Sequence, residues 1–466
     1  MGLLQTLRKP VLLKKQQLTV PQVQSSISEG SVSSSSTFES GTLSTPTSSS
    51  PSTSAFSNRS AVFQETPAEV YRALKPILTL LENQSSKLYY EWPSDEKQVD
   101  ENWTININDQ IKPVKKLKLA NNELIFELND GKKLQLPLID HDSSMGTFKY
   151  ESNYIVFLTS PSVTLVCDNI NYVSTLKRLI SLSIFEHFSL FKSATGTFLS
   201  TVGLHIPDMH VVLNSEFNFK DWCEIYVEGQ GWIRAWCHIN RKRSSKFGLS
   251  SPQKNERKGK YQIKFYKDNK STSPSSQSNL ICYIPDSNNV EDVFFYNLRS
   301  SLLEPTNFVD NTNHIKLLGE IFFNQECNLN DISSRKSFSP KRSVSTASIK
   351  SSSSSSQNKS SFKVNKKGLL IRPIPHNGIS HIETFIRFII PIFDVTRKYG
   401  RPNHFKSSRN DMDSLMFGLP KLPHLDYFQH EDIKTLLSRE YCYTGGEDLL
   451  SFSMNWCKNA LNEYIN

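Results

Sequence analysis

Short runs of alternating apolar and polar residues predict a sheet in the first half of the chain, followed by one amphipathic helix. Seven such runs lie at 87–92, 103–107, 114–119, 123–128, 132–138, 154–158 and 163–167. Asn129-Asp130-Gly131, between two of the runs, carries the Asp-Gly signal of a tight hairpin. Apolar residues then recur at helical spacing from Val173 to Phe191, and this stripe gives out near Gly196. We therefore expect several strands closed by a single helix.

The same order of elements recurs further along the chain. Aromatic, alternating runs at 222–227 and 232–239 are joined by Glu228-Gly229-Gln230-Gly231, which predicts a compact hairpin. Five further runs lie at 261–266, 280–284, 290–296, 315–323 and 368–372. Ser380-His381-Ile382-Glu383 has the capping-box pattern of a helix start, and a second amphipathic helix is expected from there to Tyr399.

Serine-rich stretches separate the predicted folded regions. Residues 1–65 are expected to form a disordered, Ser/Thr-rich N-terminal segment. Within them, residues from about 25 to 60 are dominated by Ser and Thr and contain too few large apolar side chains to offset chain entropy. Residues 331–367 have a similar composition and predict a disordered insertion. The predicted domains are 66–200, which opens with a short leading helix, and 201–399, which contains the insertion. A helical extension over 400–466 is expected to pack on the second domain.

Four short motifs carry a resemblance to a known family. They are Asp221-Trp222-Cys223-Glu224-Ile225-Tyr226-Val227, Phe388-Ile389-Ile390-Pro391-Ile392-Phe393-Asp394, Tyr399-Gly400-Arg401-Pro402 and Ser414-Leu415-Met416-Phe417-Gly418-Leu419-Pro420. Together they resemble a fungal family of pleckstrin-homology (PH) domain proteins, over residues 67–466. The resemblance implies an α+β, mainly β fold. It would consist of two PH-like seven-stranded barrels, each closed by a C-terminal helix, among disordered Ser-rich segments.

The resemblance also implies a function. The family includes cortical, bud-neck-associated proteins and a factor linked to a deadenylase complex. It therefore implies a non-enzymatic adaptor or scaffold, cytoplasmic and peripheral at the cell cortex or bud neck, with a part in polarity or cell-wall organisation. The alternative is a protein-binding regulatory subunit of a cytoplasmic mRNA deadenylation complex. One departure is that the loop 228–231 lacks the Lys/Arg cluster of phosphoinositide-binding members.

Charge is concentrated in two places. The net charge is +9, yet residues 241–270 alone carry 11 Lys or Arg and 2 Asp or Glu, and residues 331–372 carry 10 and 1. In the first patch, basic side chains leave one strand and enter the next, so both limbs of one loop are candidates for binding anionic phospholipid. The candidate lipid-binding residues are Arg241, Lys242, Arg243, Lys246, Arg257, Lys258, Lys260 and Lys264. Each contributes about 1 kcal/mol near an anionic leaflet, so the anchor is weak and peripheral. The alternative is a solvated loop whose charges only maintain solubility.

Three residues are candidates for modification. Gly2 opens a myristoylation pattern, with basic residues after it, although an ordinary disordered terminus is the favoured alternative. Ser251 and Ser339 each precede Pro in the Ser-Pro-x-Lys/Arg form that proline-directed kinases favour. Phosphate at either position would oppose attraction to anionic lipid, whereas an unmodified linker is the alternative.

The remaining motifs exclude other functions. No phosphate-binding glycine loop, nucleophile elbow or HExxH pair is present, so neither catalysis nor a cofactor is expected. The seven cysteines include no CxxC pair, which argues against a zinc site and favours a reducing, intracellular compartment. The apolar runs are too short for a transmembrane segment. The basic segments lack the interleaved aromatics that stack bases, so direct nucleic-acid binding is not expected and protein partners are.

Overall fold

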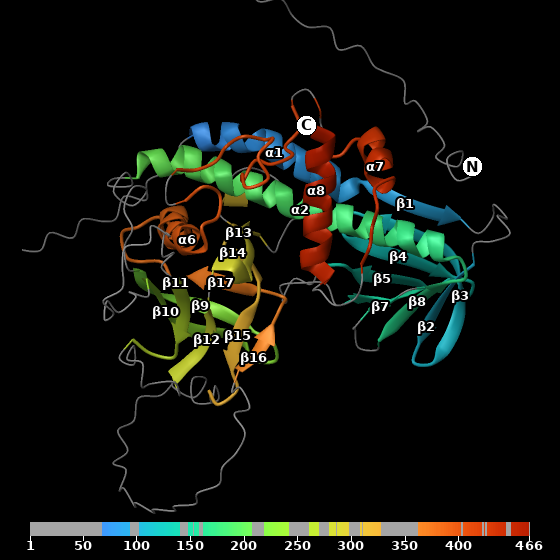
Figure 1. Ribbon diagram of the computed structural model, residues 1–466, viewed down its shortest axis with the longest axis horizontal. Coiled ribbons are helices and arrows are strands. Elements are labelled where there is room, and N and C mark those ends of the chain that lie inside the picture. The colour runs from blue at the N-terminus through green and yellow to red at the C-terminus, as the bar shows by residue number, and fades with distance from the viewer. Residues whose placement is uncertain are drawn as a thin grey trace, which may run out of the picture. The chain divides into compact units, whose positions relative to one another are not determined.

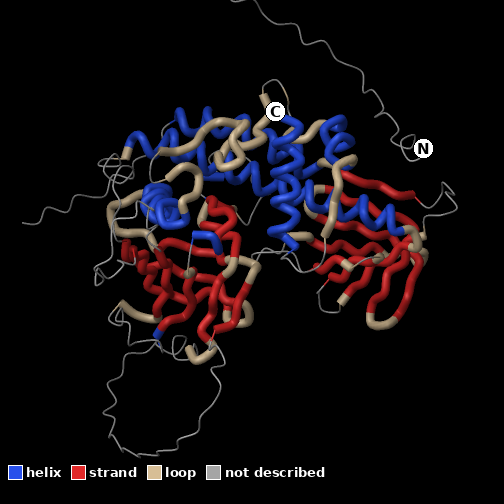
Figure 2. Tube along the Cα trace, viewed as in Figure 1, coloured by secondary structure: helices blue, strands red, loops and turns tan. Residues whose placement is uncertain are grey.

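The structure is a computed structural model (Figure 1). It describes residues 68–465 except for 94–101, 140–147, 152, 158–161, 207–218, 242–260, 270–278, 286, 298–307, 310, 328–361, 402–403, 422–423, 425 and 444–448. Two antiparallel sheets and a group of helices make up this part of the chain (Figure 2). None of the helices in it is long and apolar enough to span a bilayer.

The first sheet has eight strands. They are β1 (Leu88–Pro93), β2 (Trp103–Ile107), β3 (Gln110–Ala120), β4 (Glu123–Leu128), β5 (Lys133–Pro137), β6 (Phe148–Tyr150), β7 (Tyr154–Phe157) and β8 (Val163–Cys167). Their order is β5-β4-β3-β2-β8-β7-β6, and β1 pairs with β3. The seven predicted strands are confirmed, but β6 was missed because three residues are too few to show alternation.

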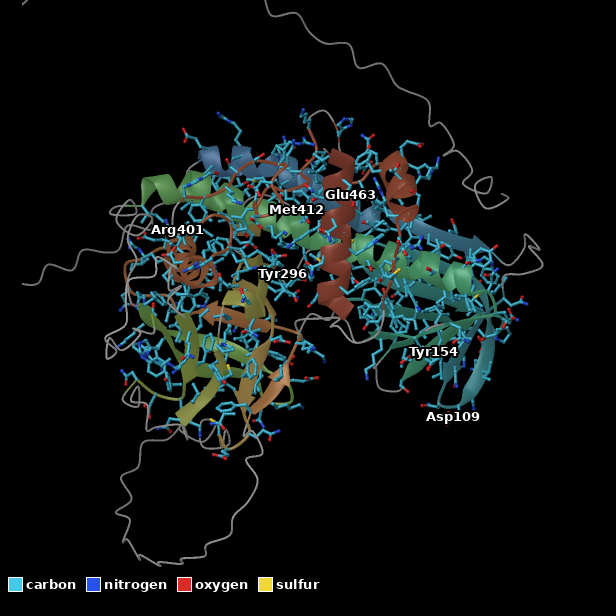
Figure 3. All side chains as sticks on the ribbon, viewed as in Figure 1. Asp109, Tyr154, Tyr296, Arg401, Met412 and Glu463 are labelled. Atoms are coloured by element: carbon cyan, nitrogen blue, oxygen red, sulfur yellow. The ribbon has the colours of Figure 1, made fainter. Side chains whose placement is uncertain are left out.

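Tight turns set the register of the first sheet. Gly131, at φ +78°, turns the predicted β4–β5 hairpin. Between β2 and β3, Ile107 pairs with Gln110, so Asn108 and Asp109 form a two-residue turn. Both adopt positive φ, as a primed hairpin turn requires. Asp109 lies at the tip of this hairpin (Figure 3).

The second sheet has nine strands. They are β9 (Phe219–Val227), β10 (Gly231–Arg241), β11 (Tyr261–Tyr266), β12 (Leu280–Ile284), β13 (Val290–Tyr296), β14 (His314–Gly319), β15 (Ile321–Asn324), β16 (Phe362–Asn365) and β17 (Leu369–Pro373). A 3-10 helix, η2 (Ser287–Asn289), precedes β13. The order is β13-β14-β17-β9-β10-β11-β12-β15-β16. Val227 pairs with Gly231, which confirms the predicted β9–β10 hairpin.

Two strand predictions for the second sheet were wrong. The predicted run 315–323 is two strands, β14 and β15, because Gly319 turns the chain at φ +137° against the backbone of Asn289. Strand β16 lies inside the predicted disordered insertion 331–367, where Phe362 and Val364 alternate with polar residues and pair with β15. The sheets therefore have eight and nine strands instead of seven each. The described strands of each form an open path, not a closed barrel.

The two sheets share one strand order. Without β1, the first path reads β6-β7-β8-β2-β3-β4-β5, and the second reads β13-β14-β17-β9-β10-β11-β12 before β15 and β16. In the first path, the three strands that precede helix α2 (Ile170–His205) in the chain come first and the four opening strands follow. The second path, ahead of helix α6 (His381–Thr396), has the same order once β15 and β16, which lie between β14 and β17 in the chain, are set aside. Ser380 caps α6 by accepting a hydrogen bond from the backbone N–H of Glu383, which confirms the predicted helix start.

Helix α2 is longer than the sequence predicts, and Gly196 lies within it. A side chain at Gly196 would place Cβ 2.9 Å from Met416 Cε and 3.3 Å from Leu415 Cβ, so glycine here allows a close approach of the segment 415–416. The missing side chain therefore reflects packing rather than a helix end. Helix α1 (Ala68–Ser86), which packs beside α2, is the predicted leading helix, and it continues through Pro76 to a length of 19 residues.

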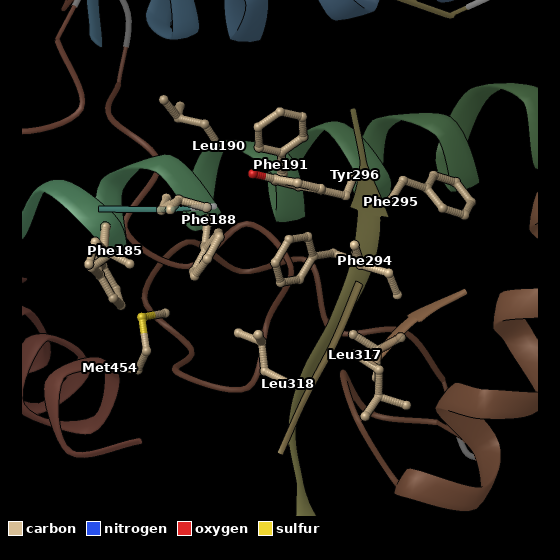
Figure 4. Packing of buried hydrophobic residues seen from close by; sticks show 14 of the residues in the cluster. Phe185, Phe188, Leu190, Phe191, Phe294, Phe295, Tyr296, Leu317, Leu318 and Met454 are labelled. Atoms are coloured by element: carbon tan, nitrogen blue, oxygen red, sulfur yellow. The ribbon is translucent and has the colours of Figure 1, made fainter. Parts of the chain in front are cut away.

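Helix α2 serves both sheets. Every residue from 179 to 199 except Gly196 is buried, as expected for a helix covered on all sides. Its first half packs on β1 and β8, and its second half packs on β13. Phe188 stacks near Phe294, with ring centroids 5.5 Å apart, and Phe191 lies 4.8 Å from Tyr296 (Figure 4). The expectation that each sheet has its own closing helix therefore fails for α2, which the two sheets share.

Buried polar groups of α2 also bond to both sheets. Glu186 accepts from Lys87 Nζ at 2.9 Å and from Tyr89 Oη at 2.7 Å, next to and within β1. Lys192 Nζ lies 3.4 Å from a carboxylate oxygen of Asp292 in β13. Because both pairs are buried, each fixes the register of α2 against one sheet.

The C-terminal residues pack chiefly on α2. Helices α7 (His430–Leu437) and α8 (Leu449–Ile465) both contact α2. The sequence predicted packing of this segment on the second domain. Arg178 donates to the carbonyl oxygen of Leu437 at 2.6 Å, and Ser181 donates to Ser453 at 2.9 Å. The segment also contacts the second domain, since Lys458 Nζ of α8 lies 3.2 Å from Asp292 of β13, and Arg401 Nε donates to Asp394 of α6 at 2.7 Å.

Candidate functional site on the outer face of the second sheet

Alternation along β9 and β10 separates two sets of side chains. Cys223, Ile225, Ala235 and Cys237 are fully buried in the core. The intervening positions are half-buried or exposed, and they carry Trp222, Glu224, Tyr226, Trp232, Arg234 and Trp236. Since successive strand residues point to opposite faces, these six side chains lie together on the outer face of the sheet.

Indole rings and guanidinium groups stack on this face. Arg234 Cζ lies 4.4 Å from the ring centroid of Trp222, and Arg372 Cζ lies 4.1 Å from that of Trp232. Trp222 and Trp236 pair across the strands with centroids 5.1 Å apart and ring planes at 64°. We call these five residues, Trp222, Trp232, Arg234, Trp236 and Arg372, the Trp–Arg surface. Each of the two guanidinium groups lies over an aromatic ring in a cation–π contact.

Both terminal nitrogens of Arg372 have partners within the protein. Its Nη1 donates to Glu224 at 3.1 Å, and its Nη2 lies 3.1 Å from Nε2 of His314. Burial, reinforced by the charge of Arg372, lowers the pKa of His314 to about 3. The imidazole is therefore neutral at pH 7 and accepts the hydrogen bond from Arg372. These contacts give Arg372 a structural role.

Arg234 is placed differently. Its side chain is exposed, and no carboxylate pairs with it in the part of the chain that the structure describes. The neighbouring Glu224 is directly across from it in the β9–β10 register but is already bound to Arg372. The Arg234 guanidinium is thus stacked and held in place while its N–H edges face solvent.

A second, basic region lies toward the other end of the same strands. His238 pairs in register with Lys220 of β9 and Lys264 of β11, so the three side chains form one cross-strand row. Burial, with help from both lysines, lowers the pKa of His238 below its ordinary value. Arg241 pairs with Tyr261 at the last position of the β10–β11 ladder. The two limbs of the predicted basic loop therefore leave the sheet side by side.

Only part of the predicted lipid-binding set is described. Lys264 is half-buried on β11, and Arg241 ends β10. The remaining predicted residues lie outside the described residues, namely Lys242, Arg243, Lys246, Arg257, Lys258 and Lys260. The modification candidates Gly2, Ser251 and Ser339 also lie outside them.

The sequence prediction assigned no role to the Trp–Arg surface. Its signal was present, since Trp, Arg and Trp alternate at 232, 234 and 236 opposite a Trp at 222. The partner Arg372 is more than a hundred residues away in the chain, so its stacking on Trp232 required the pairing of β17 with β9. Among the described residues, no group of three or more His, Cys, Asp or Glu side chains is arranged to hold a metal ion.

Comparisons with known proteins agree with this architecture. A family model described as "Fungal PH-like domain" matches residues 205–417, which contain β9 to β17 and α6. "Uncharacterized protein YJL016W" of Saccharomyces cerevisiae is 36% identical over 482 aligned residues, covering 95% of this chain and 80% of the relative. "CCR4-NOT transcriptional complex subunit CAF120" of the same organism is 27% identical over 288 residues, covering 61% of this chain but 21% of that protein. No solved structure matches the chain.

Proposed function

Because the chain belongs to the family of fungal PH-like domain proteins, we propose that it is a non-enzymatic adaptor that binds anionic membrane lipid and protein partners. The proposed location is the cytoplasmic side of the cell cortex or the bud neck, with a part in polarity or cell-wall organisation. The first sheet would then be a second PH-like module, with α2 as its helix. The strand order that the two sheets share supports this assignment.

Membrane binding rests on the end of the β10–β11 ladder. Arg241 and Tyr261 are paired there, so the loop 242–260 begins and ends at one corner of the sheet. That loop carries 7 Lys or Arg and 1 Glu, and Lys264 adds a further positive charge on β11. Each basic residue near an anionic leaflet contributes about 1 kcal/mol, so four or five engaged residues give weak, peripheral and salt-sensitive binding. Acylation at Gly2 would strengthen it, and phosphorylation at Ser251 or Ser339 would oppose it.

Vesicle flotation tests the membrane proposal. The full chain is expected to float with vesicles that contain phosphatidylserine and to stay behind with neutral phosphatidylcholine vesicles. Replacing Arg241, Lys242, Arg243 and Lys246 with alanine should abolish most of the flotation. A control removes the same charge from exposed lysines of the first sheet, namely Lys115, Lys132, Lys133 and Lys149. Equal flotation of wild type and the Arg241 set, or equal loss in both variants, would refute the role of the loop.

A second candidate function is a protein-binding regulatory subunit of a cytoplasmic mRNA deadenylation complex. The likeness to the CCR4-NOT subunit CAF120 supports it, although the match spans only 21% of that protein. Affinity purification of the full chain followed by mass spectrometry tests this candidate. Recovery of CCR4-NOT subunits above an untagged control is the expected result, and their absence under mild salt would rule the candidate out.

A further inference from the structure

We propose that the Trp–Arg surface is a docking site for an acidic segment of a partner protein, with a carboxylate of that segment bound by Arg234. This goes beyond membrane binding at the β10–β11 corner because it concerns another part of the sheet and another class of partner.

The geometry of Arg234 is that of a prepared carboxylate site. The guanidinium is stacked 4.4 Å from the Trp222 ring, so little side-chain entropy remains to be lost on binding. Its planar fork matches a carboxylate with two parallel hydrogen bonds. No described residue supplies that carboxylate, because the adjacent Glu224 is bound to Arg372. An incoming acidic side chain would complete the row Arg372, Glu224, Arg234 that the strand register sets out.

The surroundings of Arg234 fit a polypeptide. Trp222, Trp232, Trp236 and Tyr226 are half-buried. Their rings pack in two edge-to-face pairs, Trp222 with Trp236 and Tyr226 with Trp232. Trp, Tyr and Arg are the residues that dominate protein-binding hot spots. A segment that places apolar or aromatic side chains beside its carboxylates would contact these rings while Arg234 is paired.

A membrane fits this surface less well. Interfacial tryptophans bind membranes by inserting their rings, but Trp222 and Trp232 are each covered by a guanidinium. The Trp–Arg surface is also separate from the end of the β10–β11 ladder, where the basic loop begins. Arg234 and Arg241 are seven residues apart on β10, which is roughly 23 Å at the rise of a strand. That distance exceeds the Debye length of about 8 Å at physiological salt, so the two regions act independently.

The test measures binding of a labelled acidic peptide to the full chain. The peptide is a twelve-residue alternation of glutamate and tyrosine, and its affinity is followed by fluorescence anisotropy at 0.15 M salt. To remove binding by the basic loop, all proteins carry alanine at Arg241 and at the seven Lys and Arg positions of residues 242–260. Arg234→Glu should weaken binding by about tenfold or more, since the charge-assisted hydrogen bonds to the peptide carboxylate are lost and a repelling charge replaces them. Arg234→Lys should weaken it several-fold, because the charge remains but the fork is lost.

A matched control isolates the surface from total charge. Arg72 of α1 is exposed, and Arg72→Glu makes the same charge change away from the second sheet. That variant should bind the peptide like its parent, and thermal unfolding should confirm that all variants are folded. Equal weakening in Arg234→Glu and Arg72→Glu would overturn the proposal. Arg234→Glu is also made in the chain with its native loop. If that variant no longer floats with vesicles while its peptide binding is unchanged, the proposal is overturned and the surface is assigned to lipid. Failure of flotation in every protein would refute membrane binding and leave this test unaffected.

Discussion

Asp292 is the point at which three parts of the protein meet, so its removal gives the sharpest test of how they are joined. The carboxylate is 2% exposed. It lies 3.4 Å from Lys192 Nζ of α2 and 3.2 Å from Lys458 Nζ of α8, and it accepts a hydrogen bond from Tyr399 Oη at 3.0 Å. Burial alone would raise the pKa of Asp292, but the lysines outweigh it and hold that pKa well below its usual range.

The substitution Asp292→Asn keeps the volume and a hydrogen-bond acceptor but removes the charge. Lys192, buried by α2 and β13, then has no counter-ion at this position. Removing one partner of a buried ion pair costs about 3–5 kcal/mol, and we expect the free energy of unfolding to fall by that amount. Urea unfolding, followed by tryptophan fluorescence, should show a lower midpoint with an unchanged slope.

Two further variants decide whether the charge is responsible. Lys192→Met added to Asp292→Asn should recover about 1–3 kcal/mol, because it removes the unpaired buried ammonium. Asp130→Asn removes an exposed carboxylate whose nearest lysine, Lys112, is 3.8 Å away, and it should change the stability by less than about 0.5 kcal/mol. If Asp292→Asn unfolds within 1 kcal/mol of wild type, or if Lys192→Met restores nothing, the buried charges do not join α2 to β13 as described.

Three other predictions concern α2, the β14–β17 pair and His314. Gly196→Leu should lower the free energy of unfolding by about 1–3 kcal/mol through a clash with Leu415 and Met416, and calorimetry that finds an unchanged melting temperature would contradict this packing. Gly368→Ala should lower the free energy of unfolding by more than about 2 kcal/mol, since Gly368 has φ +82° and a Cβ there would lie 2.1 Å from the Leu317 carbonyl oxygen. Urea unfolding that shows no loss of stability would disprove this close approach. The folded-state pKa of His314, about 3, is below its unfolded value, so the unfolded chain binds more protons and stability falls as pH falls through 6.5 toward 3. Between pH 6.5 and 5 the loss is about 1.5 kcal/mol from this group, and His314→Gln should remove it from the pH profile of unfolding.

Much of the local structure follows from neighbouring residues. The strand runs, the hairpins at Gly131 and at 228–230 and the cap at Ser380 depend on residues close together in the chain, and their positions were predicted. Strand β6, the break at Gly319 and strand β16 were missed. Strands β6 and β16 are too short for the alternation of apolar and polar residues to be recognised. The break at Gly319 depends on a distant partner, the backbone of Asn289.

The candidate sites divide in the same way. The basic residues of the β10–β11 loop are visible in the sequence as a local excess of charge, because charge needs no partner to be recognised. The Trp–Arg surface is different, since Arg372 reaches Trp232 only through the pairing of β17 with β9. Without that pairing, nothing distinguishes Arg234, which has no carboxylate partner among the described residues, from Arg372, which has one.

By itself, the sequence determined the two groups of strands, the helices and their family, since side-chain period, turn residues and short motifs are local properties. Only the tertiary structure decided that α2 is shared. The apolar stripe from Val173 to Phe191 predicts a buried helix but not which surfaces bury it. Glu186 and Lys192 on that helix are read as ordinary charged residues until Lys87, Tyr89 and Asp292 are brought to them from other elements. Burying charge is favourable only when such partners are in place, so folding of the whole chain selects the arrangement.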